Sequence, residues 1–152
     1  MDRNDIKERN DQVKQWLWRY REAKKDLRRL EEELHELIVT QESTGAIEYS
    51  DMPRGGGSQS DLSDYIVKRE KVRRKIHKAR YKRIAVFQEI KNAIERLPTA
   101  DQREVMSYRY LKIMNWEEIC VKVGKSWKTV VFDLHGKALR NIKIPEENLK
   151  SK

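Results

Sequence analysis

The sequence predicts an all-α protein in which a long antiparallel coiled-coil hairpin precedes a compact three-helix module. Two heptad series of apolar residues predict the long helices, and helix-capping residues between positions 98 and 143 predict the short ones. Four of the six glycines fall between the two heptad series and predict their connection. The predicted divisions are residues 1–97 for the hairpin, with a flexible glycine-rich loop at 41–60, residues 98–143 for the module, and residues 144–152 for a frayed tail.

The first heptad series spans the amino-terminal forty residues. Apolar side chains recur every seven residues, and a second set follows three residues after the first: Ile6, Val13, Tyr20, Leu27 and Leu34, then Trp16, Ala23, Leu30 and Leu37. This pattern is typical of a helix that packs along its whole length against a partner helix. We predict one uninterrupted helix that begins at Asn4 or Asp5 and ends near Thr40.

A second heptad series follows the loop and predicts a helix of similar length. Its seam positions are Leu62, Arg69, Ile76, Arg83, Ile90 and Leu97, together with Tyr65, Val72, Ala79, Val86 and Ala93. The pattern suits either a hairpin within one chain or a dimer in which each helix also meets a second chain.

The middle of this second helix is strongly basic. Between Lys68 and Arg83, ten lysines and arginines accompany one acid, Glu70, although the formal charge of the whole chain is +9. Folding the hairpin brings this run beside the basic residues of the first helix. The run is either a solvated face or a surface whose like charges are compensated by a phosphate backbone. The candidate contacts on this basic rod are Arg73, Arg74, Lys78, Arg80 and Lys82.

Capping residues mark the three helices of the carboxyl-terminal module. Thr99 with Gln102 and Asn115 with Glu118 have the spacing of capping boxes. Ser126 is placed to cap a third, longer helix, which Pro145 ends. Gly124 supplies the positive φ that a tight turn before this third helix requires.

The third helix has two distinct faces. At 100° per residue, the side chains directed toward the core are Trp127, Val130, Val131, Leu134, Ala138 and Ile142, and those directed outward are Lys128, Thr129, Phe132, Asp133, Gly136 and Arg140. An exposed phenylalanine beside a lysine and a threonine suits the base edges and thymine methyls of a DNA major groove. The alternative is a three-helix core module with one irregular face, because a helical hairpin alone is a weak pattern for DNA binding.

The same segment resembles region 4 of sigma-70-type factors. It resembles more closely the sigma-like C-terminal module of phage late-gene transcription regulators of the ArpU/RinA type. The motifs that carry the resemblance are Arg103-Glu104-Val105, Arg109-Tyr110-Leu111, Trp116-Glu117-Glu118-Ile119, Val123-Gly124, Ser126 and Leu134-His135-Gly136-Lys137-Ala138-Leu139. A Pro53-Arg54-Gly55 stretch in the loop extends the resemblance to almost the whole chain.

The resemblance implies a sequence-specific DNA-binding transcription regulator, an activator of phage late genes that works at promoters with host RNA polymerase. Its helix-turn-helix module would contact double-stranded DNA, and the coiled coil would place it or form a homodimer. The segment between Gly124 and Val131 is one residue longer than in the family pattern, which leaves either Ser126 or Trp127 as the cap. The implied base contacts are Ser126, Trp127, Lys128, Thr129 and Phe132, and the implied phosphate contacts are Lys112, Lys122, Lys125, His135, Lys137 and Arg140.

Catalytic, cofactor and membrane signals are absent from the sequence. The three histidines are far apart, and the single cysteine, Cys120, excludes an internal disulfide. No apolar run approaches the roughly 20 residues of a membrane span. We therefore expect a cytoplasmic protein that is not an enzyme and uses no cofactor. The resemblance to phage regulators implies that this cytoplasm is that of a bacterial host cell. Two other functions stay open: a small terminase-like DNA-recognition subunit of a viral packaging machine, and a coiled-coil adaptor for an acidic protein.

Overall fold

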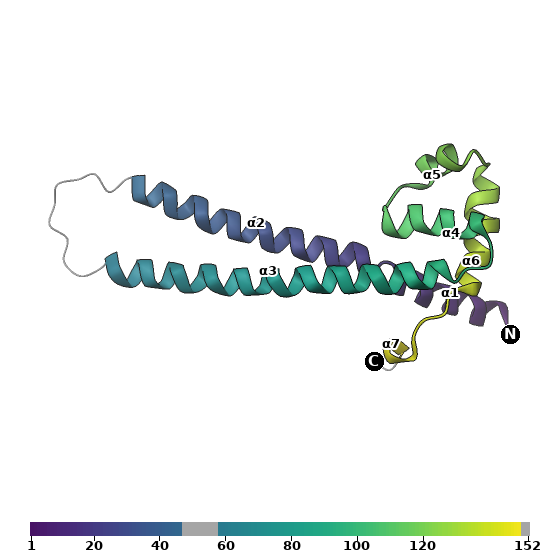
Figure 1. The fold of residues 1–152 in the computed structure, drawn as a ribbon, viewed down its shortest axis with the longest axis horizontal. Coiled ribbons are helices and arrows are strands. Elements are labelled where there is room, and N and C mark those ends of the chain that lie inside the picture. Colours follow the sequence, from purple (N-terminus) through teal and green to yellow (C-terminus); the bar gives the residue numbers. More distant parts are fainter. Residues whose placement is uncertain (47–57, 150–152) are drawn as a thin grey trace. The chain divides into compact units, whose positions relative to one another are not determined.

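The structure, a computed structural model, describes the backbone of residues 1–46 and 58–149 and the side chains of residues 1–43 and 61–149. All regular secondary structure in these residues is helical, which confirms the all-α class (Figure 1). The chain forms two compact units: Met1–Ala23 with Ile84–Lys152, here called unit 1, and Lys24–Arg83, here called unit 2. The central part of the predicted loop, residues 47–57, lies outside the described residues.

Two helices replace the single amino-terminal helix that the heptads predicted. Helix α1 (Arg3–Leu17) is capped by Asp2, with Asp5 completing the capping box, so the predicted start at Asn4 or Asp5 is two to three residues too late. Helix α2 (Arg19–Ala46) follows after Trp18, whose ψ of −6° departs from the helical value near −42°. The Trp18 ring lies 4.7 Å from that of Tyr110, centroid to centroid. This long-range contact is one that a heptad pattern does not encode.

Helices α2 and α3 extend further into the predicted loop than we expected. Helix α2 extends to Ala46 and helix α3 (Ser58–Glu95) begins at Ser58, so both enter the segment 41–60 that we expected to be a loop. Each helix also passes from one compact unit into the other. The units therefore divide within α2 and α3, and residue 97, where we placed the end of the hairpin, lies inside unit 1.

Unit 2 consists of the two long helices side by side, running in opposite chain directions (Figure 1). Arg80 lies 3.5 Å from Glu31, and Leu37 and Tyr65 line the same shallow cavity. Residues later in α2 therefore lie beside residues earlier in α3, as they must in an antiparallel pair. Its buried side chains are Leu27, Val72 and Ile76, with Leu30, Leu34, Leu37 and Ala79 half-buried around them. Leu62, a predicted seam residue, is exposed. The seam is therefore narrow.

Unit 1 packs the ends of the long helices against a series of short ones. These are α4 (Ala100–Met106), the π-helical turn η1 (Ser107–Leu111), α5 (Trp116–Val123), the π-helical turn η2 (Lys128–Leu134), α6 (His135–Asn141) and α7 (Glu146–Leu149). One buried cluster joins α1, α2 and α3 to α6 through residues such as Leu17, Ile90 and Leu139. A second cluster joins α4, α5 and η2 through Val105, Ile119 and Val130. The predicted three-helix segment thus shares its core with the first and the last residues of the predicted hairpin.

The end of the chain is more ordered than a frayed tail up to residue 149. Helix α6 already ends at Asn141, because Ile142 is extended with ψ 131°, and the Ile144 side chain packs on the core of unit 1. Pro145 precedes the short helix α7, and its carbonyl accepts a hydrogen bond from the Asn148 backbone at 3.0 Å. Proline thus stands at a helix start, where its missing N–H costs nothing, and does not end the preceding helix as we predicted.

Candidate nucleic-acid interface

Two caps position the first two helices of the carboxyl-terminal segment. Thr99 Oγ1 accepts a hydrogen bond from the Gln102 backbone at 3.2 Å, as predicted. The Gln102 side chain does not return to the cap, because it is buried and its oxygen accepts from Asn141 Nδ2 at 3.3 Å. The Asn115 and Glu118 side chains each accept from the other's backbone N–H, at 2.8 and 3.2 Å. One predicted capping box is therefore complete and the other is half-formed.

The turn into the third helix is built as the sequence predicted. Gly124 adopts φ +66°, and its N–H donates to the Cys120 carbonyl at 3.0 Å. Ser126 Oγ accepts from the Thr129 N–H at 3.3 Å and lies 3.0 Å from Thr129 Oγ1. Ser126, and not Trp127, is therefore the residue that caps the helix.

The third helix departs from regular α-geometry at its start. Residues Lys128–Leu134 form a π-helical turn, in which hydrogen bonds span five residues and the register of faces shifts. Val130, Ala138 and Ile142 are buried as predicted, but His135 and Leu139 are buried as well, and Val131 and Leu134 only partly. Trp127 is 45% exposed, which contradicts its predicted core position. It lies in the first turn, ahead of the core layer that Val130 forms.

The predicted base-contacting residues lie on one short segment at this helix start. Phe132 is 71% exposed, and Lys128, four residues earlier, is exposed without an acidic partner among the described residues. Because four residues are close to one helical turn, these two side chains lie on the same side. Thr129 is half-buried and its hydroxyl is engaged with Ser126. The surface of this segment therefore combines one cation with two large exposed rings, those of Trp127 and Phe132.

The predicted phosphate-contacting cations are exposed, with two of them held by acids. Lys125 pairs with Asp101 at 3.1 Å and Lys137 with Asp133 at 2.9 Å. Lys122 and Arg140 are exposed, and the Lys112 ammonium lies 5.1 Å from the centre of the Tyr108 ring. Exposed ion pairs are worth about 0–1 kcal/mol, so a phosphate could replace either carboxylate at little cost.

His135 is not available as a phosphate contact, and this prediction was wrong. The ring is 7% exposed, and its Nε2 is hydrogen-bonded to the Tyr110 hydroxyl at 2.8 Å. The Trp116 ring packs edge-on against it, with 4.7 Å between centroids. Burial, helped by the positive charges of Lys14 and Arg109, lowers the pKa of His135 to about 4. The imidazole is therefore neutral at pH 7 and closed to solvent.

Arg109 links the elements around the segment between η1 and α5, and sequence reasoning missed this role. Its guanidinium lies 4.9 Å from the centre of the Trp18 ring and 4.5 Å from that of Trp116. Its Nη1 donates to the Met114 carbonyl at 3.1 Å. The adjacent Ile113 has φ +56°, a conformation unfavourable for a β-branched residue. Arg109 thus fixes a strained turn that no local sequence signal marks.

All five predicted rod residues of unit 2 are exposed, but they differ in their partners. Arg73 pairs with Glu70 at 3.4 Å and Arg80 with Glu31 at 3.5 Å. Arg74, Lys78 and Lys82 have no acidic partner among the described residues. The rod is therefore basic over one part of its surface and charge-compensated over another.

Outside these surfaces, the described residues contain no cluster of three or more histidine, cysteine or acidic side chains that could hold a metal ion. Among the helices in the described parts of the chain, none combines the length and apolar character that crossing a bilayer requires. No protein-family model, curated protein or solved structure matches this chain significantly. The family resemblance therefore stays a prediction that rests on the residue motifs alone.

Proposed function

We propose that this protein is a sequence-specific DNA-binding transcription regulator of the phage late-gene type, without enzymatic activity, that acts at promoters together with RNA polymerase. In this proposal the segment from α4 to α6 is a helix-turn-helix module of the sigma region 4 kind. The long helices form an antiparallel coiled-coil hairpin that places the module or dimerises it. Double-stranded DNA is the primary partner.

The observation that carries the proposal is the exposed start of the third helix. Phe132, one of two phenylalanines in the chain, is mostly exposed, and Lys128 has no acidic partner among the described residues. A rigid turn holds them, through the positive φ of Gly124 and the Ser126 cap. A lysine can donate to guanine O6 and N7, and an apolar ring can contact the thymine methyl. Such a segment suits a major groove better than bulk solvent.

Phosphate contacts would orient the module. Lys122, Lys125, Lys137 and Arg140 are exposed, and Lys112 adds a fifth cation before α5. Contacts of this kind fix register on the duplex but carry no sequence information. In this proposal Lys128 and Phe132, with Trp127 beside them, contact the bases. The surrounding cations contact phosphates and so position the module on the duplex.

The test begins with selection of bound duplexes from a random pool at two salt concentrations, which defines a preferred sequence. Affinities of the wild type and K128A/F132A are then compared on the selected and random duplexes. We expect the ratio of the two affinities to fall at least about tenfold in the variant, since one good base contact contributes 1–3 kcal/mol of discrimination. Weak binding to random DNA should remain.

The matched control is K143A/L149A, which removes an exposed lysine and an exposed apolar residue that follow helix α6 in the chain. Its affinity ratio should equal that of the wild type. A pool without any enriched sequence, or an equal loss by K128A/F132A on both duplexes, would contradict base readout by this helix.

A further inference from the structure

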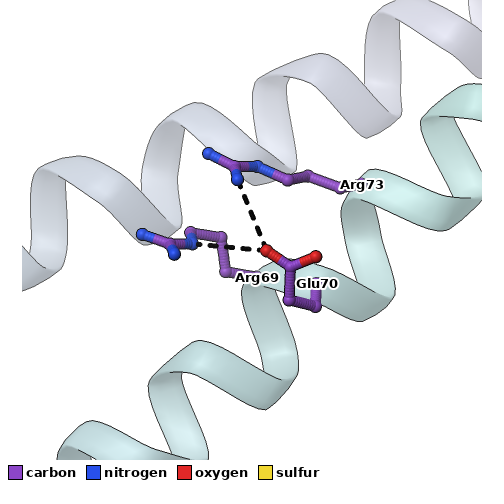
Figure 2. A network of polar contacts seen from close by, with 3 residues as sticks. All are labelled: Arg69, Glu70 and Arg73. Atoms are coloured by element: carbon purple, nitrogen blue, oxygen red, sulfur yellow. Dashed lines mark hydrogen bonds and ion pairs between the residues drawn. The ribbon is translucent and has the colours of Figure 1, made fainter.

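Eight of the ten cations from Lys68 to Arg83 on helix α3 fall into two groups according to their partners. Glu70 is the single acid between Lys68 and Arg83. Its carboxylate lies 3.9 Å from Arg69 Nε and 3.4 Å from Arg73 Nη1 (Figure 2). Arg80 reaches across to Glu31 of α2 at 3.5 Å. The arginines of this group are thus compensated by protein carboxylates.

The second group forms a continuous row, here called the cationic row. All its side chains are exposed, and none has an acidic partner among the described residues: Lys71, Arg74, Lys75, Lys78 and Lys82. At 100° per residue they occupy an arc of about 100° on α3, and every residue between positions 71 and 82 that falls within that arc is a cation. The row extends about 16 Å along the helix axis, at 1.5 Å per residue.

Such a row opposes the stability of its own helix. Lys71 and Lys75, Arg74 and Lys78, and Lys78 and Lys82 are each four residues apart, the spacing at which side chains meet on a helix. Like charges at this spacing are destabilising, and Glu70 and Glu31 are engaged with other arginines. An external anion with several charges in line would relieve the repulsion along the whole row.

We propose that the cationic row is a second, sequence-independent nucleic-acid site that binds the phosphate backbone of double-stranded DNA. A linear array of cations complements a linear array of phosphates, and counterion release favours the contact. An anionic membrane is less suited, because surface-bound helices insert an apolar face. Between Lys68 and Arg83, Val72 and Ile76 of α3 are buried, and Tyr81 is the one large apolar side chain that is exposed. The site shares the DNA partner with the proposed function but needs none of its base contacts.

The test compares two variants that lower the formal charge by the same amount. R74Q/K75Q/K78Q/K82Q removes four members of the row. R28Q/R29Q/R73Q/R80Q removes four exposed arginines of unit 2 that pair with Glu32, Asp26, Glu70 and Glu31. Binding to a duplex of random sequence is measured by fluorescence anisotropy at four salt concentrations. The slope of log affinity against log salt reports the number of phosphates contacted.

We expect the row variant to lower the magnitude of this slope by about 3 to 4, at about 0.9 per phosphate, and the control variant by less than about 1. Affinity for random DNA in 50 mM salt should fall at least about tenfold in the row variant. The charge-conserving variant R74K/K75R/K78R/K82R should restore both quantities. Far-UV circular dichroism establishes that all variants keep their helix content.

Equal slopes for the row and control variants would overturn the proposal. So would a row-dependent binding that is tighter for anionic vesicles, or for poly-glutamate as a mimic of an acidic protein, than for duplex DNA. The two proposals can fail separately. If no sequence is preferred but the slope falls only in the row variant, the phosphate site stands without the base-reading module.

Discussion

Unit 1 and unit 2 are built from the same two long helices but bury their side chains in different ways. In unit 1, short helices approach the long ones from several directions, so that Leu17, Ile90 and Val130 are fully enclosed. In unit 2 only one face of each helix is covered, and Leu27, Val72 and Ile76 are the buried side chains of its cluster. A heptad predicts a seam equally well in both places. The depth of burial depends on how many elements converge.

The same difference governs how charge is distributed. Unit 2 carries a run of unpaired cations on α3, which a two-helix seam tolerates because most of each helix surface faces solvent. In unit 1 the cation Arg109 is instead stacked between Trp18 and Trp116. Burial there lowers the pKa of this guanidinium below its ordinary value, although the nearby Tyr110 and Glu117 oppose the shift. Unit 1 thus uses charge to hold its shape, whereas the exposed charge of unit 2 is available to a partner.

The largest expected effect comes from truncating matched isoleucines in the two cores. Ile90 of unit 1 is 0% exposed and Ile76 of unit 2 is 5% exposed. We expect Ile90→Ala to lower the free energy of unfolding by about 4 kcal/mol and Ile76→Ala by about 2 kcal/mol, because the cavity in the narrow seam collapses or fills with water more easily. All four tryptophans lie in unit 1, so their fluorescence reports on that unit during urea unfolding.

Circular dichroism followed in the same titration reports on the helices of both units. Ile76→Ala should shift the dichroism transition more than the fluorescence transition. If both substitutions shift the fluorescence midpoint equally, the chain unfolds as one cooperative body. The expected difference in stability between the two units would then be wrong.

The next largest effect is a dependence of the stability of unit 1 on pH, which His135 causes. Its pKa is lowered from 6.5 to about 4 by burial first and then by Lys14 and Arg109, while Tyr110 holds its Nε2. Because the unfolded chain binds the proton more tightly, stability is fully present above pH 6.5 and falls as the pH is lowered toward 4, by about 3 kcal/mol in all. Urea unfolding followed by tryptophan fluorescence between pH 7 and 5 measures the slope of the free energy of unfolding against pH.

His135→Asn should flatten that slope, even though it lowers stability at pH 7. The control is His77→Asn in unit 2, where the ring contacts Tyr81, an exposed residue. A wild-type slope that survives in His135→Asn would show that carboxylates, and not this imidazole, set the acid sensitivity of unit 1.

The smallest expected effect concerns the turn between α5 and η2 in unit 1. Gly124 has φ +66° and Gly136 has helical geometry, and an added Cβ would meet no atom within 4 Å at either position. We therefore expect Gly124→Ala to destabilise by about 1 kcal/mol through backbone strain alone, and Gly136→Ala to stabilise by about 0.5 kcal/mol. Thermal unfolding of the two variants, followed by tryptophan fluorescence, gives the difference. Destabilisation of similar size at both positions would mean that packing around the added Cβ, and not the backbone φ, determines the change in stability.

Several local features were predictable from the residues. The caps Thr99, Asn115 and Ser126 and the positive φ of Gly124 lie where predicted, because a cap or a turn involves groups only a few residues apart. The candidate reading face was also predictable in part, since Phe132 and Lys128 are exposed. Its use in DNA recognition stays a prediction. The cationic row was recognisable only as a charge excess, because the pairs of Glu70 and Glu31 decide which cations are free.

What the sequence determined by itself is the helical class, the apolar faces of the long helices and the starts of the short ones, since periodicity and capping act within a few turns. The tertiary structure decided the break at Trp18, the burial of His135 and the exposure of Trp127. The Trp18 ring meets a tyrosine far along the chain, and a π-helical turn changes the register that regular geometry would give to the third helix. Contacts between distant residues outweigh local preference in unit 1, because several elements compete there for one enclosed core.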